Sequence, residues 1–122
     1  ANGTDANKAL VLEFAKQVLT EGHHDRLANF VGADLIEHES RIAGGREGFA
    51  AALQTGLVGA YDMLFKLIGE GDIVVTYSRV FRNEADHAVF DIYRIEDGLI
   101  AEHWGISEPI LPRDQWGNSG KF

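Results

Sequence analysis

Residues 90–104 of this chain read FDIYRIEDGLIAEHW, and this stretch decides the fold. Its two halves are rich in β-branched and aromatic residues, and they flank Glu96-Asp97-Gly98, a sequence typical of a tight turn. A connection this short joins antiparallel neighbours. The stretch therefore predicts a β-hairpin.

The strand-like pattern continues on the N-terminal side of this hairpin. Runs of residues that favour strands occupy positions 61–68, 73–81, 87–95 and 99–107. Short segments with the composition of turns separate these runs. Three short connections in succession predict a sheet of antiparallel neighbours.

The N-terminal part has the periodicity of helices instead. Leu10, Phe14 and Val18 recur every four residues, which predicts a helix over residues 5–21 that ends at Gly22. A shorter helix is expected over residues 25–31, a short strand over 35–39 and a third helix over 46–56. Helices followed by a run of antiparallel strands indicate the α+β class.

The composition excludes several classes of function. The 122 residues suit one domain, and a hydrophobic content of 45% is enough for a core. A net charge of −8 would repel a phosphate backbone, so no nucleic-acid partner is expected. The chain has no cysteine, which excludes disulfides, thiolate catalysis and cysteine-ligated zinc. No stretch approaches the roughly 18 apolar residues of a membrane span, so no membrane partner is expected.

The expected domain covers the whole sequence. We expect a single domain over residues 1–122, with a core over about 5–110 and an irregular tail over 111–122. Residues 1–5 have neither a basic start nor an apolar core, so an intact signal peptide is not expected there. The lack of cysteine fits the cytoplasmic location that we expect, while export followed by cleavage also fits the sequence.

One carboxylate lies among apolar residues on the third long strand. Alternation places Asp91 on the same face as Val89 and Tyr93. A buried, ionised carboxylate without a partner is costly, so Asp91 must either find a donor or keep its proton. Both a structural ion pair and a place in a pocket fit this pattern.

Two histidines fall on other strands. His38 lies between Glu37 and Glu39, which favours a surface position, and His103 alternates with Gly105 on the last strand. Alternation alone does not identify the inner face of the last strand, because both of its faces are mixed. The five histidines lack metal-binding spacing, and the chain has no nucleophile elbow, phosphate loop or dinucleotide fingerprint. Neither a metal nor a cofactor is therefore expected.

Three segments resemble a known family. Residues 90–104 resemble the C-terminal hairpin of SnoaL-like polyketide cyclases, which belong with ketosteroid isomerase to the nuclear transport factor 2-like superfamily. Residues 35–39 (LIEHE) and 44–49 (GGREGF) resemble the first strand and a helix entrance of that family. The similarity extends over about residues 7–109.

The resemblance implies a cone-shaped α+β fold, in which a strongly curved antiparallel sheet wraps around three N-terminal helices and leaves one pocket. It also implies a small organic molecule as ligand and a homodimer packed through the sheet. By position, His38 would be the general base, with Asp91 or His103 as the donor to an enolate oxygen. The residues expected to line the ligand pocket are Tyr93, Glu108 and Phe14.

Two positions depart from the family. Gly105 stands where the cyclases carry an aspartate that acts as acid and base, and Ala15 stands where the isomerase has its oxyanion tyrosine. The expected function is a small-molecule pocket protein, a cofactor-free lyase or isomerase that uses acid–base chemistry on a small carbonyl compound. The alternative is a non-catalytic ligand-binding or protein-assembly module of the same fold.

Overall fold

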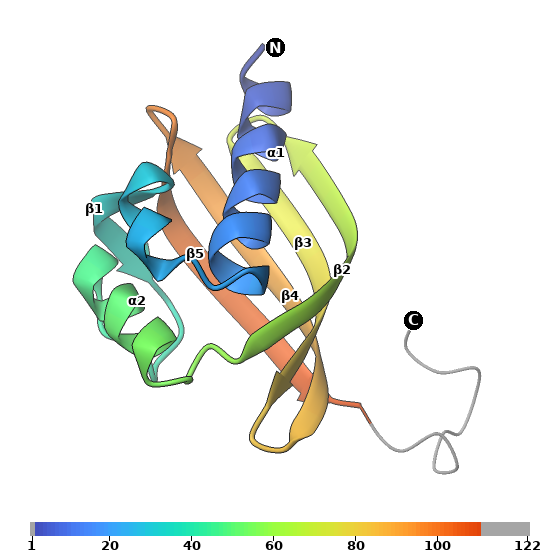
Figure 1. The fold of residues 1–122 in the computed structure, drawn as a ribbon. Coiled ribbons are helices and arrows are strands. Elements are labelled where there is room, and N and C mark those ends of the chain that lie inside the picture. The colour runs from blue at the N-terminus through green and yellow to red at the C-terminus, as the bar shows by residue number, and fades with distance from the viewer. Residues whose placement is uncertain (1, 111–122) are drawn as a thin grey trace.

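A curved five-stranded sheet holds the N-terminal helix in its hollow (Figure 1). The computed structural model describes residues 2–110 of the chain. Its helical elements are α1 (Asn2–Phe14), η1 (Ala15–Thr20), η2 (His24–Asn29) and α2 (Gly45–Gln54). Its strands are β1 (Val31–Glu37), β2 (Ala60–Glu70), β3 (Ile73–Arg82), β4 (Ala85–Glu96) and β5 (Leu99–Pro109). The tail predicted for residues 111–122 lies outside the described residues.

The strands from β2 to β5 form the antiparallel sheet that the sequence predicts. The order across the sheet is β1-β5-β4-β3-β2, and each of the last three strands pairs with the one before it in the chain. The turn in the predicted hairpin places both Asp97 (φ 53°) and Gly98 (φ 77°) in the left-handed region. A two-residue turn of this kind matches the twist of the flanking strands. The hairpin of residues 90–104 is therefore confirmed.

The N-terminal elements differ in detail from their predicted bounds. The first helix continues from α1 into the π-helical turn η1, and the second is the short 3₁₀ helix η2. Strand β1 begins at Val31, four residues before its predicted start, and lies parallel to β5, with Val31 opposite Ile100. Both side chains are almost fully buried, so β1 extends the sheet where it can cover the core.

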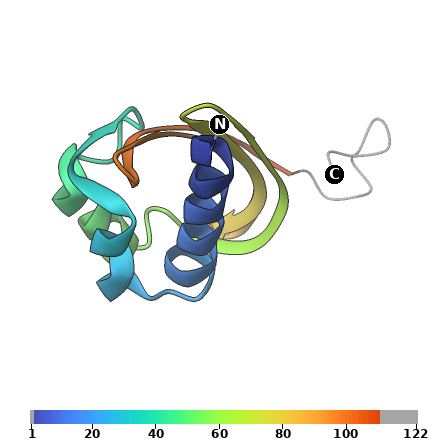
Figure 2. The ribbon, with the colours of Figure 1, turned by 90° about the horizontal axis from the view of Figure 1, so that it is seen from above.

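The core lies between the concave face of the sheet and the helices, and Figure 2 shows the sheet curving around α1. Phe14 of α1 is 1% exposed and packs edge-on against Tyr93, with 5.8 Å between the ring centroids. It also lies near Phe30 and Phe49. This is the cone-shaped α+β fold that was expected. In the part of the chain that the structure describes, no helix is both long and apolar enough to cross a membrane.

Candidate functional site

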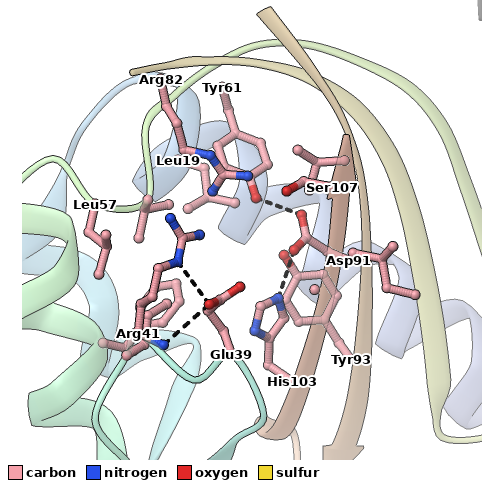
Figure 3. Close-up of a pocket in the computed structure, with 16 residues that line it drawn as sticks. Leu19, Glu39, Arg41, Leu57, Tyr61, Arg82, Asp91, Tyr93, His103 and Ser107 are labelled. Carbon is pink, nitrogen blue, oxygen red and sulfur yellow. Dashed lines mark hydrogen bonds and ion pairs between the residues drawn. The ribbon is translucent and has the colours of Figure 1, made fainter. Parts of the chain in front are cut away.

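A pocket lies between the concave face of the sheet and the loop that follows β1 (Figure 3). Sixteen residues line it. Its polar and titratable lining residues include Glu39, Arg41, Tyr61, Arg82, Asp91, Tyr93, His103 and Ser107. The cavity volume is about 30 Å³, which is room for about two water molecules, and the free space including the part open to solvent is about 450 Å³. A ligand larger than water must therefore enter from the open side or displace lining side chains.

His103 lies between two buried carboxylates at the inner wall of this pocket. Its Nε2 is 2.7 Å from Oδ1 of Asp91, and its Nδ1 is 2.8 Å from both carboxylate oxygens of Glu37. The side chains of His103, Asp91 and Glu37 are 9%, 3% and 0% exposed. Water therefore screens these contacts very little.

The geometry fixes the number of protons among these three groups. Each short nitrogen–oxygen contact needs one proton, so two protons lie among His103, Glu37 and Asp91. Burial disfavours the charged ring and lowers the pKa of His103, but hydrogen bonds to Asp91 and Glu37, and their charges, outweigh burial and raise the pKa from 6.5 to about 9. At neutral pH His103 is therefore an imidazolium between two carboxylates.

Stability should fall as the pH rises from about 6.5 to about 9. The folded chain holds the His103 proton more tightly than the unfolded chain does. The stabilisation is therefore fully present below the unfolded pKa of 6.5 and is lost as the pH passes about 9. The difference between the folded and unfolded pKa values of His103 corresponds to about 3 kcal/mol of unfolding free energy. Urea unfolding at a series of pH values measures it, and an unfolding free energy that stays constant across this window would contradict a buried imidazolium.

Tyr61 completes the hydrogen bonding of Asp91. The Tyr61 hydroxyl donates to Oδ2 of Asp91 over 2.6 Å, while His103 donates to Oδ1. Burial, reinforced by the charge of Asp91, raises the pKa of Tyr61 well above 10, and the same two causes raise the pKa of Tyr93. Both phenols therefore stay neutral donors. Tyr61, Asp91, His103 and Glu37 form one continuous hydrogen-bonded series.

Gly105 leaves the front of this series open to the pocket. Gly105 pairs with Asp91 across the sheet, and Tyr93 pairs with His103. A Cβ atom at position 105 would lie 3.4 Å from Oδ1 of Asp91 and 3.4 Å from Cε1 of His103. Any longer side chain would cover or crowd the contact between them. The absence of a side chain at Gly105 therefore leaves room in the pocket wall beside Asp91 and His103.

The structure does not bring His38 into this pocket, so the prediction that it shares this space is wrong. Glu37, the last residue of β1, pairs with His103 and faces the concave side, so His38, which follows it, turns to the convex side. His38 Nε2 contacts Oε2 of Glu102 at 2.6 Å, and its ring stacks on Trp104 with 4.8 Å between centroids. Its side chain is 41% exposed. His38 is not among the residues that line the pocket around Asp91.

Two predicted lining residues also lie elsewhere. Glu108 pairs with Ala88, and alternation from the buried Val89 places it on the convex face, where it borders a shallow depression with Tyr77 and Phe90. Phe14 belongs to the core, beside a space of only about 10 Å³. Both placements are corrections to the expected pocket.

Tyr93, in contrast, lines the pocket as expected, and Asp91 and His103 meet there. Glu37 as the second partner of His103, and Arg41 and Arg82 in the pocket wall, were not predicted from the sequence. The signal for Glu37 was its alternation with Leu35, which is buried.

Within residues 2–110, no group of three or more His, Asp or Glu side chains is arranged to hold a metal ion.

Solved structures share this fold. A protein assigned as a ketosteroid isomerase from Kribbella flavida superposes with a TM-score of 0.75 at 14% identity, covering 98% of this chain and 93% of that one. An LEH-like epoxide hydrolase from M. tuberculosis superposes with a TM-score of 0.70 at 16% identity, covering 86% of this chain and 84% of that one. A protein assigned as a polyketide cyclase from Acidithiobacillus ferrooxidans superposes with a TM-score of 0.67 at 16% identity, covering 84% of this chain and 88% of that one.

No protein-family model matches the sequence, and no curated protein matches it. Several further matching structures are of proteins described as NTF2-like. At these identities the likeness establishes the fold, and the chain has the NTF2-like fold that the resemblance of residues 90–104 implied. The chemistry of the site has to be argued from its own residues.

Proposed function

We propose that this protein is a cofactor-free enzyme that moves protons on a small carbonyl compound, with Asp91 as the group that takes and returns the proton. The observation that carries the proposal is the buried series of Tyr61, Asp91, His103 and Glu37, which meets the pocket beside Gly105. A catalytic base has to be held in one orientation. Asp91 is held in this way, because each of its oxygens accepts one hydrogen bond from a buried donor.

The proposed step is an enolisation. The C–H bond next to the substrate carbonyl breaks, its proton passes to Asp91, and the electron pair moves onto the carbonyl oxygen. Protonation of Asp91 weakens its hold on the Tyr61 hydroxyl and on Nε2–H of His103, so either donor becomes available to the enolate oxygen. Return of the proton to another carbon gives an isomer. Attack of the enolate carbon on a second carbonyl forms an alkoxide, which takes the proton from Asp91 to give an aldol product.

Glu37 has a positioning role in this proposal. It does not line the pocket, and its two oxygens hold Nδ1 of His103 from behind. Its negative charge keeps the ring protonated and oriented toward Asp91. Asp91 thereby replaces His38 as the proposed base.

Hydrogen–deuterium exchange tests the function directly. The protein is incubated in D₂O with a panel of small ketones and keto acids, and loss of the α-proton signals is followed by ¹H NMR. We expect exchange above the buffer rate for at least one class of compound. If ligands bind, as seen in chemical-shift changes around Asp91, but no α-proton exchanges, the protein is the non-catalytic binding module that is the alternative function.

We also propose that two copies associate through the convex face of the sheet. Large apolar side chains are about half exposed or more there, among them Ile68 (61%), Phe81 (50%), Phe90 (46%) and Ile106 (64%). Phe90 and Ile106 are paired neighbours on β4 and β5, so part of this apolar surface is continuous. Light scattering should give twice the chain mass of 13.4 kDa. A single-chain mass at high micromolar concentration would rule out this association.

A further inference from the structure

The pocket wall opposite Asp91 carries a guanidinium, that of Arg82. Arg82, the last residue of β3, lines the pocket near Tyr61 (Figure 3). Within residues 2–110 its side chain forms no hydrogen bond and no ion pair. Arg79, three residues earlier, is bound to Asp62 over 2.9 Å, so the same strand offers a paired arginine for comparison. Arg82 is only partly exposed, and none of its N–H groups has an acceptor among the described residues, so they can bind an acceptor that a ligand supplies.

A second guanidinium faces the same space. Arg41 donates from Nε to Oε1 of Glu39 over 2.9 Å, and this is its one side-chain bond to the described part of the chain. Its terminal nitrogens point into the open centre of the pocket in Figure 3. The hydrogen bond from Arg41 lowers the pKa of Glu39, and the charge of Arg82 lowers it further. Two cations and one carboxylate therefore leave one positive charge unbalanced at this end of the pocket.

This local charge contrasts with the rest of the molecule. The chain carries a net charge of −8, so its overall field repels small anions. A guanidinium presents parallel N–H groups that match the two oxygens of a carboxylate. Arg82 and Arg41 can hold such a group on one side of the pocket, away from the carboxylate of Asp91 on the other.

We infer that the substrate is a small carbonyl compound that carries a carboxylate, and that Arg82 anchors this carboxylate with Arg41 as a second contact. The inference rests on the proposed function, because it assumes that the other end of the same molecule meets Asp91. The carboxylate end sets the orientation, and the carbon next to the carbonyl then faces the base. A neutral compound of the same shape leaves Arg82 unpaired and binds less tightly.

The test uses two probes that differ in charge and by one methyl group. Both meta-hydroxybenzoate and its methyl ester present a phenol, which mimics an enol, and only the acid presents a carboxylate. Binding to the full chain is measured by NMR titration for the unmodified protein, for Arg82→Gln, and for the matched control Arg79→Gln. We expect the acid to bind at least about 10-fold more tightly than the ester. Arg82→Gln should weaken binding of the acid about 10- to 100-fold and leave the ester unchanged.

Each other outcome overturns the inference. It fails if acid and ester bind equally, if neither binds, or if Arg79→Gln weakens binding of the acid as much as Arg82→Gln does. These failures are distinct from a failure of the proposed function. If α-protons of neutral ketones exchange but the two probes bind equally, Asp91 remains the proposed base and Arg82 is not the anchor.

Discussion

Replacing Asp91 with asparagine should slow the exchange of substrate α-protons about 100- to 10,000-fold, the range that general-base groups contribute. The amide cannot accept the proton. It can still fill the same space, because its oxygen accepts from Nε2–H of His103 and its nitrogen donates to the Tyr61 hydroxyl. Glu37 continues to hold the other side of the His103 ring. The variant should therefore remain folded while losing the reaction.

The matched control for this variant is Asp62→Asn. Asp62 is an exposed aspartate on β2, the strand at the edge of the sheet beyond β3, and its partner is Arg79. Its removal should change neither exchange nor stability by more than the small contribution of a surface ion pair. Circular dichroism and urea unfolding of both variants separate loss of chemistry from loss of fold. Full exchange activity in folded Asp91→Asn would remove Asp91 from the mechanism.

Replacing His103 with glutamine should lower the free energy of unfolding by about 3–5 kcal/mol. The substitution removes the cation that lies between Glu37 and Asp91, and both carboxylates are nearly inaccessible to water. Glutamine can donate to one of them and leaves the other as a buried charge without a counter-charge. Urea unfolding below pH 6.5 measures the loss where the imidazolium contributes most.

His38→Gln is the matched control for this second prediction. His38 also contacts a carboxylate at 2.6 Å, but its side chain is 41% exposed and that of Glu102 is 17% exposed. The hydrogen bond from Arg94 lowers the pKa of Glu102 more than the hydrogen bond from His38 does. Glu102 therefore keeps its stronger partner when His38 is replaced. The control should lose less than about 1 kcal/mol. His103→Gln should also lose the fall in stability between about pH 6.5 and 9. Equal losses in the two variants would contradict the buried imidazolium.

The position of His38 shows why the sequence could not sort the candidate histidines. Leu35 and Ile36 are adjacent apolar residues on β1, so alternation offers two choices for the inner face. The structure buries Leu35, at 3% exposed, and leaves Ile36 at 48%. Glu37 then shares the inner face with Leu35, and His38 shares the outer face with Ile36. Only packing against the core distinguishes the two choices.

The last strand contains a second ambiguity of this kind. Strict alternation would put Ile100 and His103 on opposite faces, yet they are 1% and 7% exposed. The pairing passes from Ile95↔Ile100 to Arg94↔Glu102, so Ala101 is an extra residue that shifts the alternation. A β-bulge of this kind has no clear signature in the sequence, since its energy depends on the neighbouring strand. The inner position of His103 depends on it.

The sequence by itself determined the order of helices and strands, the turn at Asp97 and Gly98, and the shared face of Asp91 and Tyr93, because periodicity and turn chemistry act over a few residues. The tertiary structure decided which faces are buried, and so which ionisable groups meet. Tyr61 and Arg82 come from two different strands, and only the curvature and register of the sheet bring them to one pocket with Asp91, while Glu37 comes from a third strand and holds His103 from behind. Contacts between distant segments depend on how the whole core packs, and no local pattern encodes that.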